Sequence, residues 1–205
     1  MSMMNLRPVF ILVSVFASIL ALPVAQVVAA PKNVTPAERA MLPDYCNHTQ
    51  NYESIANPSP KAKYWLSKLG DDLWHIHHYC NSHVHWMRTQ KHGMKKHEVD
   101  FELSQVINEI RYMLLNAAPT FVLRPEMNHR SGQAALRLKQ YTDARMFFEN
   151  AIKDKNDYWP SYIELADLYL LQDNVAAAKQ VMQLADQILP QDHPRVIKLK
   201  KDLKL

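Results

Sequence analysis

Residues 159–190, WPSYIELADLYLLQDNVAAAKQVMQLADQILP, decide how this chain folds. When the sequence is laid over itself at an offset of 34 residues, this stretch matches the one before it in its order of small and large residues. The matching pairs are Gly132 with Ala166, Ala144 with Ala178, Phe148 with Met182, and Ala151 with Ala185. A partial third copy follows, in which Pro194 falls on Pro160 and Leu199 falls on Leu165. A repeat of this length is typical of helical hairpins stacked side by side.

The order of residues in 159–190 resembles the tetratricopeptide repeat. That family places apolar, small and aromatic residues in the first helix of each hairpin, then alanines around a large residue in the second helix, and a proline at the end. The residues that match this pattern are Tyr162, Ala166, Tyr169, Ala178, Met182, Ala185 and Pro190. The copy at 125–156 matches less well, because Asn128 and Ala135 stand where large apolar residues are usual. The resemblance implies an all-α fold, a right-handed stack of antiparallel helical hairpins.

Length and composition agree with a small helical protein. The 205 residues suit one compact domain or a short solenoid, and 48% hydrophobic with 21% charged residues argues against a disordered chain. Only three glycines favour helices over a turn-rich sheet fold. The net charge is +4, and its basic excess gathers in the last segment, 193–205, beyond any aromatic residue that could stack on bases. We therefore expect a solvated capping helix there and no nucleic-acid partner.

The first 30 residues have the parts of a secretory signal peptide. Arg7 precedes an apolar run over 9–22, and small residues follow up to Ala29 and Ala30. We expect removal of residues 1–30 and a periplasmic or secreted mature chain. In the alternative, residues 8–30 stay in place as an inner-membrane anchor, since this segment is long enough to span a bilayer.

The chain has two cysteines, Cys46 and Cys80. An even pair in an oxidising compartment is most simply a disulfide, which here would join a proline-rich irregular arm over 31–61 to the helix that follows it. The motifs Leu42–Cys46 (LPDYC) and His77–Cys80 (HHYC), ahead of such repeats in an exported chain, resemble a recurring bacterial arrangement. They support the pairing and imply no activity.

Between the arm and the repeats, the sequence predicts a histidine-rich helical hairpin over 62–118, which would form a degenerate repeat. Its first helix is expected over 62–90 and its second over 98–118, from apolar residues at helical spacing. On a helical wheel, His75, His78 and His85 point away from the apolar stripe. We therefore expect these three side chains to be exposed or to pack against the arm.

Two further repeats, 125–156 and 159–190, are expected within residues 119–192. Thr142 and Asn174 stand where N-caps are needed in their second helices. With the cap at 193–205, the pattern predicts about seven helices after the signal.

A metal site is the second interpretation of the histidine-rich segment. His77 and Cys80 are one helical turn apart, and Cys46 with His48 would complete a set of two cysteines and two histidines suited to zinc or copper. This set competes with the disulfide for the same two sulfurs, and export favours the disulfide. We therefore expect no cofactor, with zinc or copper binding as the alternative.

No enzyme activity is predicted. The sequence contains no glycine-rich phosphate loop, no G-x-S-x-G elbow and no H-E-x-x-H pair. Cys80 beside His77 could act as a nucleophile in principle, but a position in an apolar stripe with a disulfide partner is the stronger interpretation of this cysteine.

The resemblance also implies a groove lined by the first helix of each repeat. Its expected partner-binding residues are His129, Gln133, Arg137, Ile163, Asp167, Leu170 and Leu171. Arg137 and Asp167 would fix the register of an extended peptide or a partner helix, and the two leucines would either contact it or pack against the terminal cap. The predicted function is an exported interaction module or scaffold that holds another envelope or secreted protein. The alternative is a metal-binding or metal-handling protein.

Overall fold

The computed structural model describes residues 34–205, and within that range the chain is helical without strands. The predicted signal peptide at 1–30, the alternative anchor at 8–30 and the first residues of the arm lie outside the described residues. The helices are α1 (Pro36–Ala40), α2 (Pro60–Leu69), α3 (His77–Arg88), α4 (Lys96–Asn116), α5 (Arg124–Arg137), α6 (Tyr141–Asp154), α7 (Trp159–Leu171), α8 (Val175–Leu184) and α9 (Pro194–Leu203), with short 3-10 turns η1 (Asp44–His48) and η2 (Gly70–Trp74).

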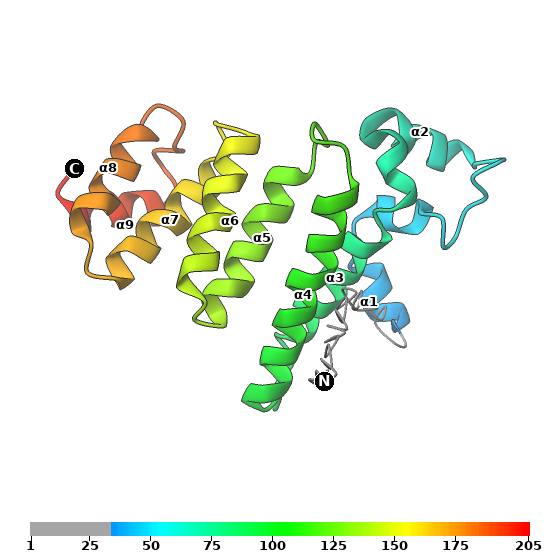
Figure 1. Cartoon of the computed structure of the whole chain (residues 1–205), viewed down its shortest axis with the longest axis horizontal. Helices are drawn as coiled ribbons and strands as arrows, with labels where there is room; N and C mark the ends of the chain where they lie inside the picture. The colour runs from blue at the N-terminus through cyan, green and yellow to red at the C-terminus, as the bar shows by residue number, and fades with distance from the viewer. Residues whose placement is uncertain (1–33) are drawn as a thin grey trace, which may run out of the picture.

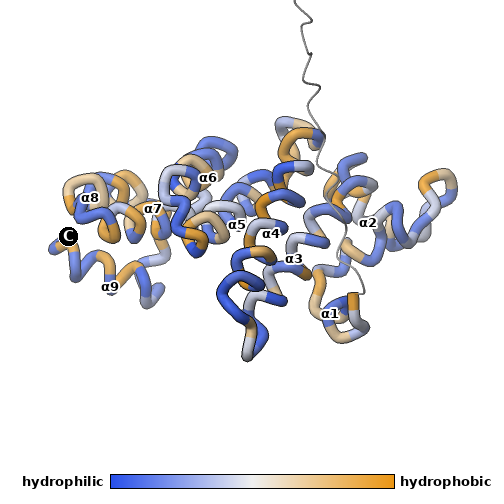
Figure 2. The backbone as a smooth tube through the Cα atoms, turned by 60° about the horizontal axis from the view of Figure 1, so that its bottom comes forward, coloured by the Kyte–Doolittle hydropathy of each residue, from blue (hydrophilic) through white to orange (hydrophobic). Residues whose placement is uncertain are grey.

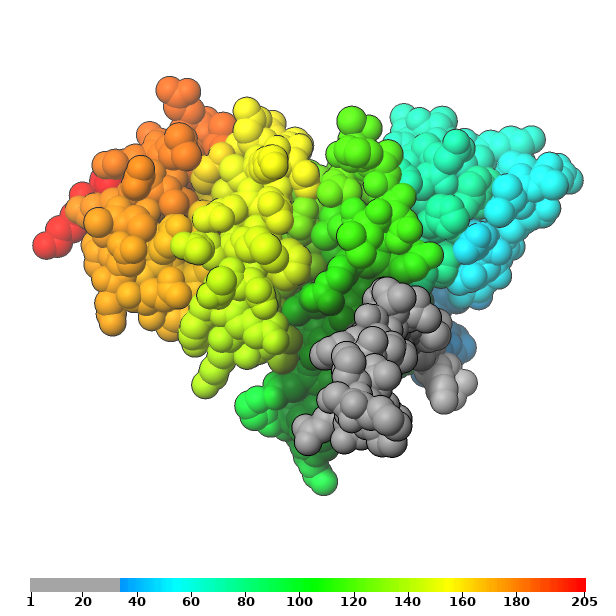
Figure 3. Space-filling model, viewed as in Figure 1, coloured from blue at the N-terminus to red at the C-terminus, as the bar shows by residue number. Residues whose placement is uncertain are grey.

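Helices α2 to α8 follow one another along the long axis of the molecule, while α1 lies beside α3 and α9 lies beside α7 and α8 (Figure 1). Helix α3 packs on α4, α5 on α6 and α7 on α8, and each of these hairpins packs on the next. In the space-filling view, successive parts of the chain accordingly form adjacent bands (Figure 3). The expected all-α stack of antiparallel hairpins is therefore the fold. The expected repeats, 125–156 and 159–190, contain α5 with α6 and α7 with α8.

The two repeats turn between their helices in the same way. Lys139 and Asp173, at equivalent positions, are both left-handed, with φ of 62° and 57°. The residue after each donates its backbone N–H to a carbonyl of the preceding helix, at 2.9 Å from Gln140 and 2.8 Å from Asn174. This is the hydrogen-bonding pattern that closes a helix and reverses the chain.

Asn174 caps α8, since its side chain accepts a hydrogen bond from the backbone N–H of Ala177. The prediction for Thr142 was wrong, because the position equivalent to Asn174 is Gln140, and Thr142 lies inside α6.

The prediction of a single helix over 62–90 was also wrong. Helix α2 ends at Leu69, Gly70 takes a φ of 67°, and η2 separates it from α3, which begins at His77. Glycine adopts a positive φ at little cost, so the chain leaves the helix there. This break and the arm helix α1 bring the described part to nine α-helices, where about seven were expected for the mature chain.

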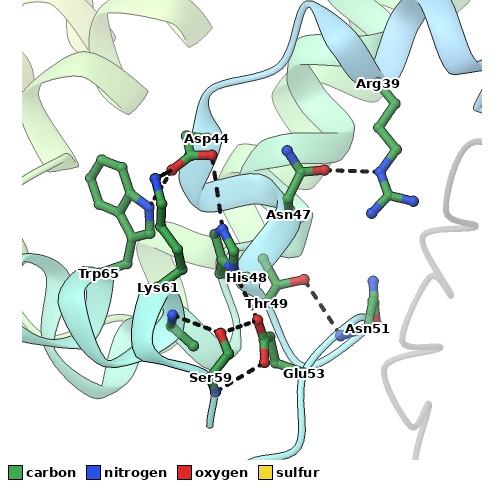
Figure 4. Close-up of polar contacts among 11 residues, drawn as sticks. Arg39, Asp44, Asn47, His48, Thr49, Asn51, Glu53, Ser59, Lys61 and Trp65 are labelled. Atoms are coloured by element: carbon green, nitrogen blue, oxygen red, sulfur yellow. Dashed lines mark hydrogen bonds and ion pairs between the residues drawn. The ribbon is translucent and has the colours of Figure 1, made fainter.

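Polar contacts fix the irregular arm between α1 and α2 (Figure 4). Asp44 accepts hydrogen bonds from the indole N–H of Trp65 at 2.9 Å and from Lys61 at 3.3 Å. Farther along the arm, Glu53 lies 2.9 Å from His48 Nδ1 and accepts from the Ser59 hydroxyl at 2.7 Å. These contacts hold a segment that has no apolar period of its own.

In Figure 2 the backbone is coloured by the hydropathy of each residue. The turn between α3 and α4 is largely hydrophilic and extends beyond the neighbouring helices (Figure 2). Among residues 34–205, no helix combines the length and the apolar character that crossing a membrane requires.

Candidate partner-binding face

The first helices of successive hairpins lie beside one another and run in the same direction. Near the start of α3 and α5, Tyr79 donates its hydroxyl to Glu126 at 2.7 Å, and at their ends Arg137 donates to the hydroxyl of Thr89, the C-cap residue of α3, at 2.7 Å. Because residue numbers rise together along the two helices, α3 and α5 are parallel.

Helices α5, α7 and α9 continue the same arrangement. Gln133 donates its side-chain N–H to Glu164 at 3.2 Å, and Arg195 donates to the same carboxylate at 2.8 Å. His129 Nδ1 lies 3.0 Å from the Ser161 hydroxyl, one turn earlier on both α5 and α7. We call the surface shared by these four helices the first-helix face. Its polar and aromatic residues are His83, Trp86, Glu126, His129, Arg130, Gln133, Arg137, Asp167 and Arg195, and the buried Tyr79 and Glu164 join the helices beneath them.

The expected groove residues divide into three groups. Four of them are polar and lie on the first-helix face: His129, Gln133, Arg137 and Asp167. Each already has a partner, since the three residues of α5 contact neighbouring parts of the chain and Asp167 pairs with Arg195. Ile163 is 1% exposed and belongs to the core of the last hairpin, so its side chain is not at the surface. Leu170 is partly buried against the same core, whereas Leu171 is 60% exposed.

Sequence reasoning missed the aromatic centre of this face. Trp86 of α3 packs against the core, and the guanidinium groups of Arg130 and Arg137 lie 4.5 and 5.2 Å from its ring centroid. A signal was present, since Glu126, Arg130 and Arg137 recur at helical spacing on one stripe of α5. The partner of that stripe could not be found, because Trp86 comes from a helix whose phase was wrongly predicted.

The two histidines of the face are held in the neutral form. Burial and, to a smaller extent, the neighbouring charge of Arg130 lower the pKa of His83 to about 4. The pKa of His129 is also about 4, because burial and the charges of Arg130 and Arg195 lower it more than the charge of Glu164 raises it. Burial raises the pKa of Glu164, but the hydrogen bond and the charge of Arg195, together with the hydrogen bond from Gln133, outweigh burial and leave the pKa of this carboxyl below its ordinary value. The cations of the face are therefore arginines.

The four residues of the alternative metal site have other partners. Cys46 and Cys80 lie at disulfide distance, with the two sulfurs 2.05 Å apart, which supports the predicted pairing. His48 lies between Glu53, at 2.9 Å, and Asp44, at 3.8 Å. His77 Nδ1 is 3.3 Å from the carbonyl of Trp74. In the part of the chain that the structure describes, no three His, Cys, Asp or Glu side chains are placed to hold a metal ion.

The prediction that His78 and His85 face solvent or the arm was wrong. His85 is 4% exposed, and its Nδ1 lies 2.5 Å from Glu102 of α4. His78 Nδ1 lies 2.6 Å from Glu109, a fully buried carboxylate of the same helix. The break at Gly70 changes the phase of α3 relative to the predicted wheel and turns both rings toward α4.

Comparison with known families agrees with the second half of the fold. Residues 135–203 match the family model described as Tetratricopeptide repeat. The match begins near the end of α5 and runs through α9, about a third of the chain, and supports the tetratricopeptide repeat family. It does not reach the LPDYC and HHYC motifs. No curated protein and no solved structure matches the chain.

Proposed function

We propose that this chain is an exported protein–protein interaction module, which holds an extended segment of another envelope or secreted protein along the first-helix face. The repeat match supports the general role, because tetratricopeptide repeat proteins are generally interaction modules without catalytic activity. The observation that carries the proposal is the parallel alignment of α3, α5 and α7, with α9 joined to α7 through Arg195, which lines up polar and aromatic side chains across all the hairpins.

The face offers an extended segment two kinds of contact. Near α3 it presents the indole of Trp86 with the arginines beside it, and at the end of α7 it presents the exposed Leu171. Between them, amide and carboxylate groups of Gln133 and Glu164 connect the helices. Because the polar contacts between hairpins fix the positions of these side chains, little order has to be created on binding, which favours affinity.

Export is supported by the cysteine pair. Both Cys46 and Cys80 are buried, at 2% and 5% exposure, and lie at disulfide distance. Structural disulfides persist in oxidising compartments and are rare where thiols are kept reduced. The N-terminal sequence suggests the same compartment, on the composition of residues 1–30.

A capture experiment with two matched variants tests the role of the face. The mature chain, with its cysteines paired, is used to capture proteins from an envelope extract of its own host. Arg137→Ala with Leu171→Ala removes one arginine and one exposed leucine from α5 and α7. The control, Arg145→Ala with Leu184→Ala, removes the same residue types from exposed positions on α6 and α8. Circular dichroism establishes that both variants fold.

We expect the control to retain the partner and the face variant to lose it by roughly tenfold or more, the effect of removing contacts at the centre of an interface. Equal capture by the two folded variants would refute the proposed use of this face.

A further inference from the structure

Two guanidinium groups share one indole on the first-helix face. Arg130 and Arg137 lie two turns apart on α5, and both lie against the ring of Trp86, at 4.5 and 5.2 Å from its centroid. An indole ring attracts cations to its face, so Trp86 accounts for where the two groups lie. It does not neutralise them.

Each arginine is held by something other than a carboxylate. Arg137 donates one guanidinium N–H to the Thr89 hydroxyl at 2.7 Å and another to the Thr89 carbonyl at 3.5 Å. Burial lowers the pKa of Arg137, which reflects the cost of holding its charge here. The Nε of Arg130 is buried and has no hydrogen-bond partner. Within residues 34–205, neither side chain forms an ion pair.

The nearby carboxylates are already engaged. Glu126 accepts a hydrogen bond from the Tyr79 hydroxyl at 2.7 Å, while Glu164 and Asp167 are both held by Arg195. His83 carries no charge at neutral pH, since burial and Arg130 lower its pKa to about 4. The partly buried end of the face therefore holds two like charges that repel each other, and an anion brought to this place would stabilise both.

We propose that Trp86, Arg130 and Arg137 form a subsite for an aspartate or glutamate side chain, so that the first-helix face selects an acidic peptide segment. This inference rests on the proposed function and names the class of its partner. A planar guanidinium group presents paired N–H donors that match the two oxygens of a carboxylate. The apolar methylenes of the acidic side chain would pack on the Trp86 ring between the two arginines.

The charges beyond the subsite favour a peptide over a nucleic acid. Glu126 lies on the same stripe of α5, and Glu164 with Asp167 lies on α7. Glu126 keeps its negative charge, because the Tyr79 hydroxyl that donates to it is neutral, and Glu164 with Asp167 carries two negative charges against the one positive charge of Arg195. A strand with a phosphate at every nucleotide would be repelled by this excess negative charge, whereas a peptide with a single acidic group places its charge at the arginines alone. Within the described residues, the face contains no row of unpaired cations of the kind that nucleic-acid backbones require.

The test uses the disulfide-bonded mature chain labelled with ¹⁵N. It is titrated with a short synthetic peptide that contains an Asp-Glu pair flanked by glycine and leucine, and separately with the same peptide carrying Asn-Gln. We expect the acidic peptide to shift the indole N–H signal of Trp86 and the Nε–H signals of Arg130 and Arg137. The amide peptide should bind roughly tenfold or more weakly, since it lacks the charge-assisted hydrogen bonds.

Three variants of the subsite and one control variant assign the effect. Arg130→Gln and Arg137→Gln should each weaken binding of the acidic peptide by roughly tenfold, whereas Arg145→Gln on α6 should leave it unchanged. Arg130→Lys keeps the charge but loses the planar donors, so its affinity should fall between those of the wild type and Arg130→Gln. The comparison of the two peptides on the unaltered chain stands even where an arginine variant fails to fold.

Equal affinity for the acidic and amide peptides would overturn the proposal, as would equal loss in Arg130→Gln and Arg145→Gln. Tighter binding of a single-stranded oligonucleotide would also overturn it. If Arg137→Ala with Leu171→Ala abolishes capture while the acidic peptide does not bind, the interaction function stands and only the partner class is wrong. If capture is unaffected as well, both proposals fail.

Discussion

At the scale of single residues, the two repeats fill one equivalent position with different pairs of side chains. In the first repeat Gly132 lies against Phe148, and a Cβ on this glycine would come within 2.5 Å of the phenyl ring. In the second repeat the same positions hold Ala166 and Met182, both buried. Where the second repeat has the larger alanine in place of glycine, it has the thinner and more flexible methionine in place of phenylalanine, as close packing requires.

Gly132→Ala is therefore expected to destabilise the protein, although alanine is favoured over glycine inside a helix by about 1 kcal/mol. The clash with Phe148 should outweigh this gain and leave a net loss of about 1–2 kcal/mol, because overpacking a tight core costs about 1–3 kcal/mol. Urea unfolding of the purified chain measures the difference.

The control for this prediction carries the pair found in the second repeat. Gly132→Ala with Phe148→Met should recover a large part of the stability that Gly132→Ala loses. A single Gly132→Ala variant that is more stable than the wild type would show that the contact between α5 and α6 is loose.

The residue pattern predicted this packing, and it failed where contacts depend on distant elements. The offset of 34 residues by itself aligned the small residues at 132 and 166 and the large ones at 148 and 182. It could not show that Asn128, which departs from the family pattern, is buried and donates to Asp154 at 2.7 Å. A polar residue can occupy an apolar position when its hydrogen bond is supplied from another helix.

At the scale of elements, one carboxylate docks the arm helix α1 onto α3. Glu38 is 7% exposed and accepts hydrogen bonds from Arg88 at 2.9 Å and Lys91 at 3.0 Å. It also closes the first turn of α1 through Thr35. The hydrogen bond from Arg88 holds the pKa of Glu38 far below its ordinary value, against the opposing effect of burial.

This lowered pKa makes the docking of α1 dependent on pH. The contribution of Glu38 to stability is fully present above its ordinary pKa of 4.5 and is lost progressively as pH falls below that value toward the folded pKa. We expect α1 to be protected from amide hydrogen exchange at neutral pH and to lose that protection in acid, before the repeats unfold.

Glu38→Gln should reproduce the acid behaviour of α1 at neutral pH, since it removes the same charge. Glu149→Gln serves as the control, because Glu149 is an exposed residue of α6 that pairs with Arg145 of its own helix, at 3.9 Å. Protection of α1 that stays the same in Glu38→Gln would show that the disulfide and the arm contacts hold this helix without the ion pair.

The sequence predicted the elements with strong periodicity and missed the interruption between α2 and α3. An isolated glycine in a helical pattern is often tolerated, so Gly70 alone did not indicate a break. The 3-10 turn that follows it buries Leu73 and Trp74 against other parts of the chain, at 0% and 9% exposure. Those tertiary contacts fix the phase of α3, and therefore the directions of His78, His85 and Trp86.

At the scale of the whole molecule, one register is repeated between successive first helices. Gln133 contacts Glu164 and Glu164 contacts Arg195, and both contacts span 31 residues. Helix α9 therefore sits on α7 as α7 sits on α5, and it takes the place of the first helix of a third repeat. The period in the sequence predicted this order of helices, but it could not show which charged groups form the contacts between them.

Because those charged groups already have partners within the chain, the expected use of the face changes. Asp167 was expected to fix the register of a partner, but Arg195 already holds it. Among the described residues of the first-helix face, the cations that remain without an ion pair are Arg130 and Arg137 beside Trp86. Partner contact is therefore expected there and at the exposed Leu171.

Photo-crosslinking of the captured partner tests the central claim most directly. An apolar photoreactive amino acid is placed at 171, at the end of α7, or at the exposed position 184 of α8. We predict crosslinks from 171 to one continuous segment of the partner, and none above background from 184. Crosslinks of equal yield from the second helices, or none from the first, would contradict the use of the first-helix face.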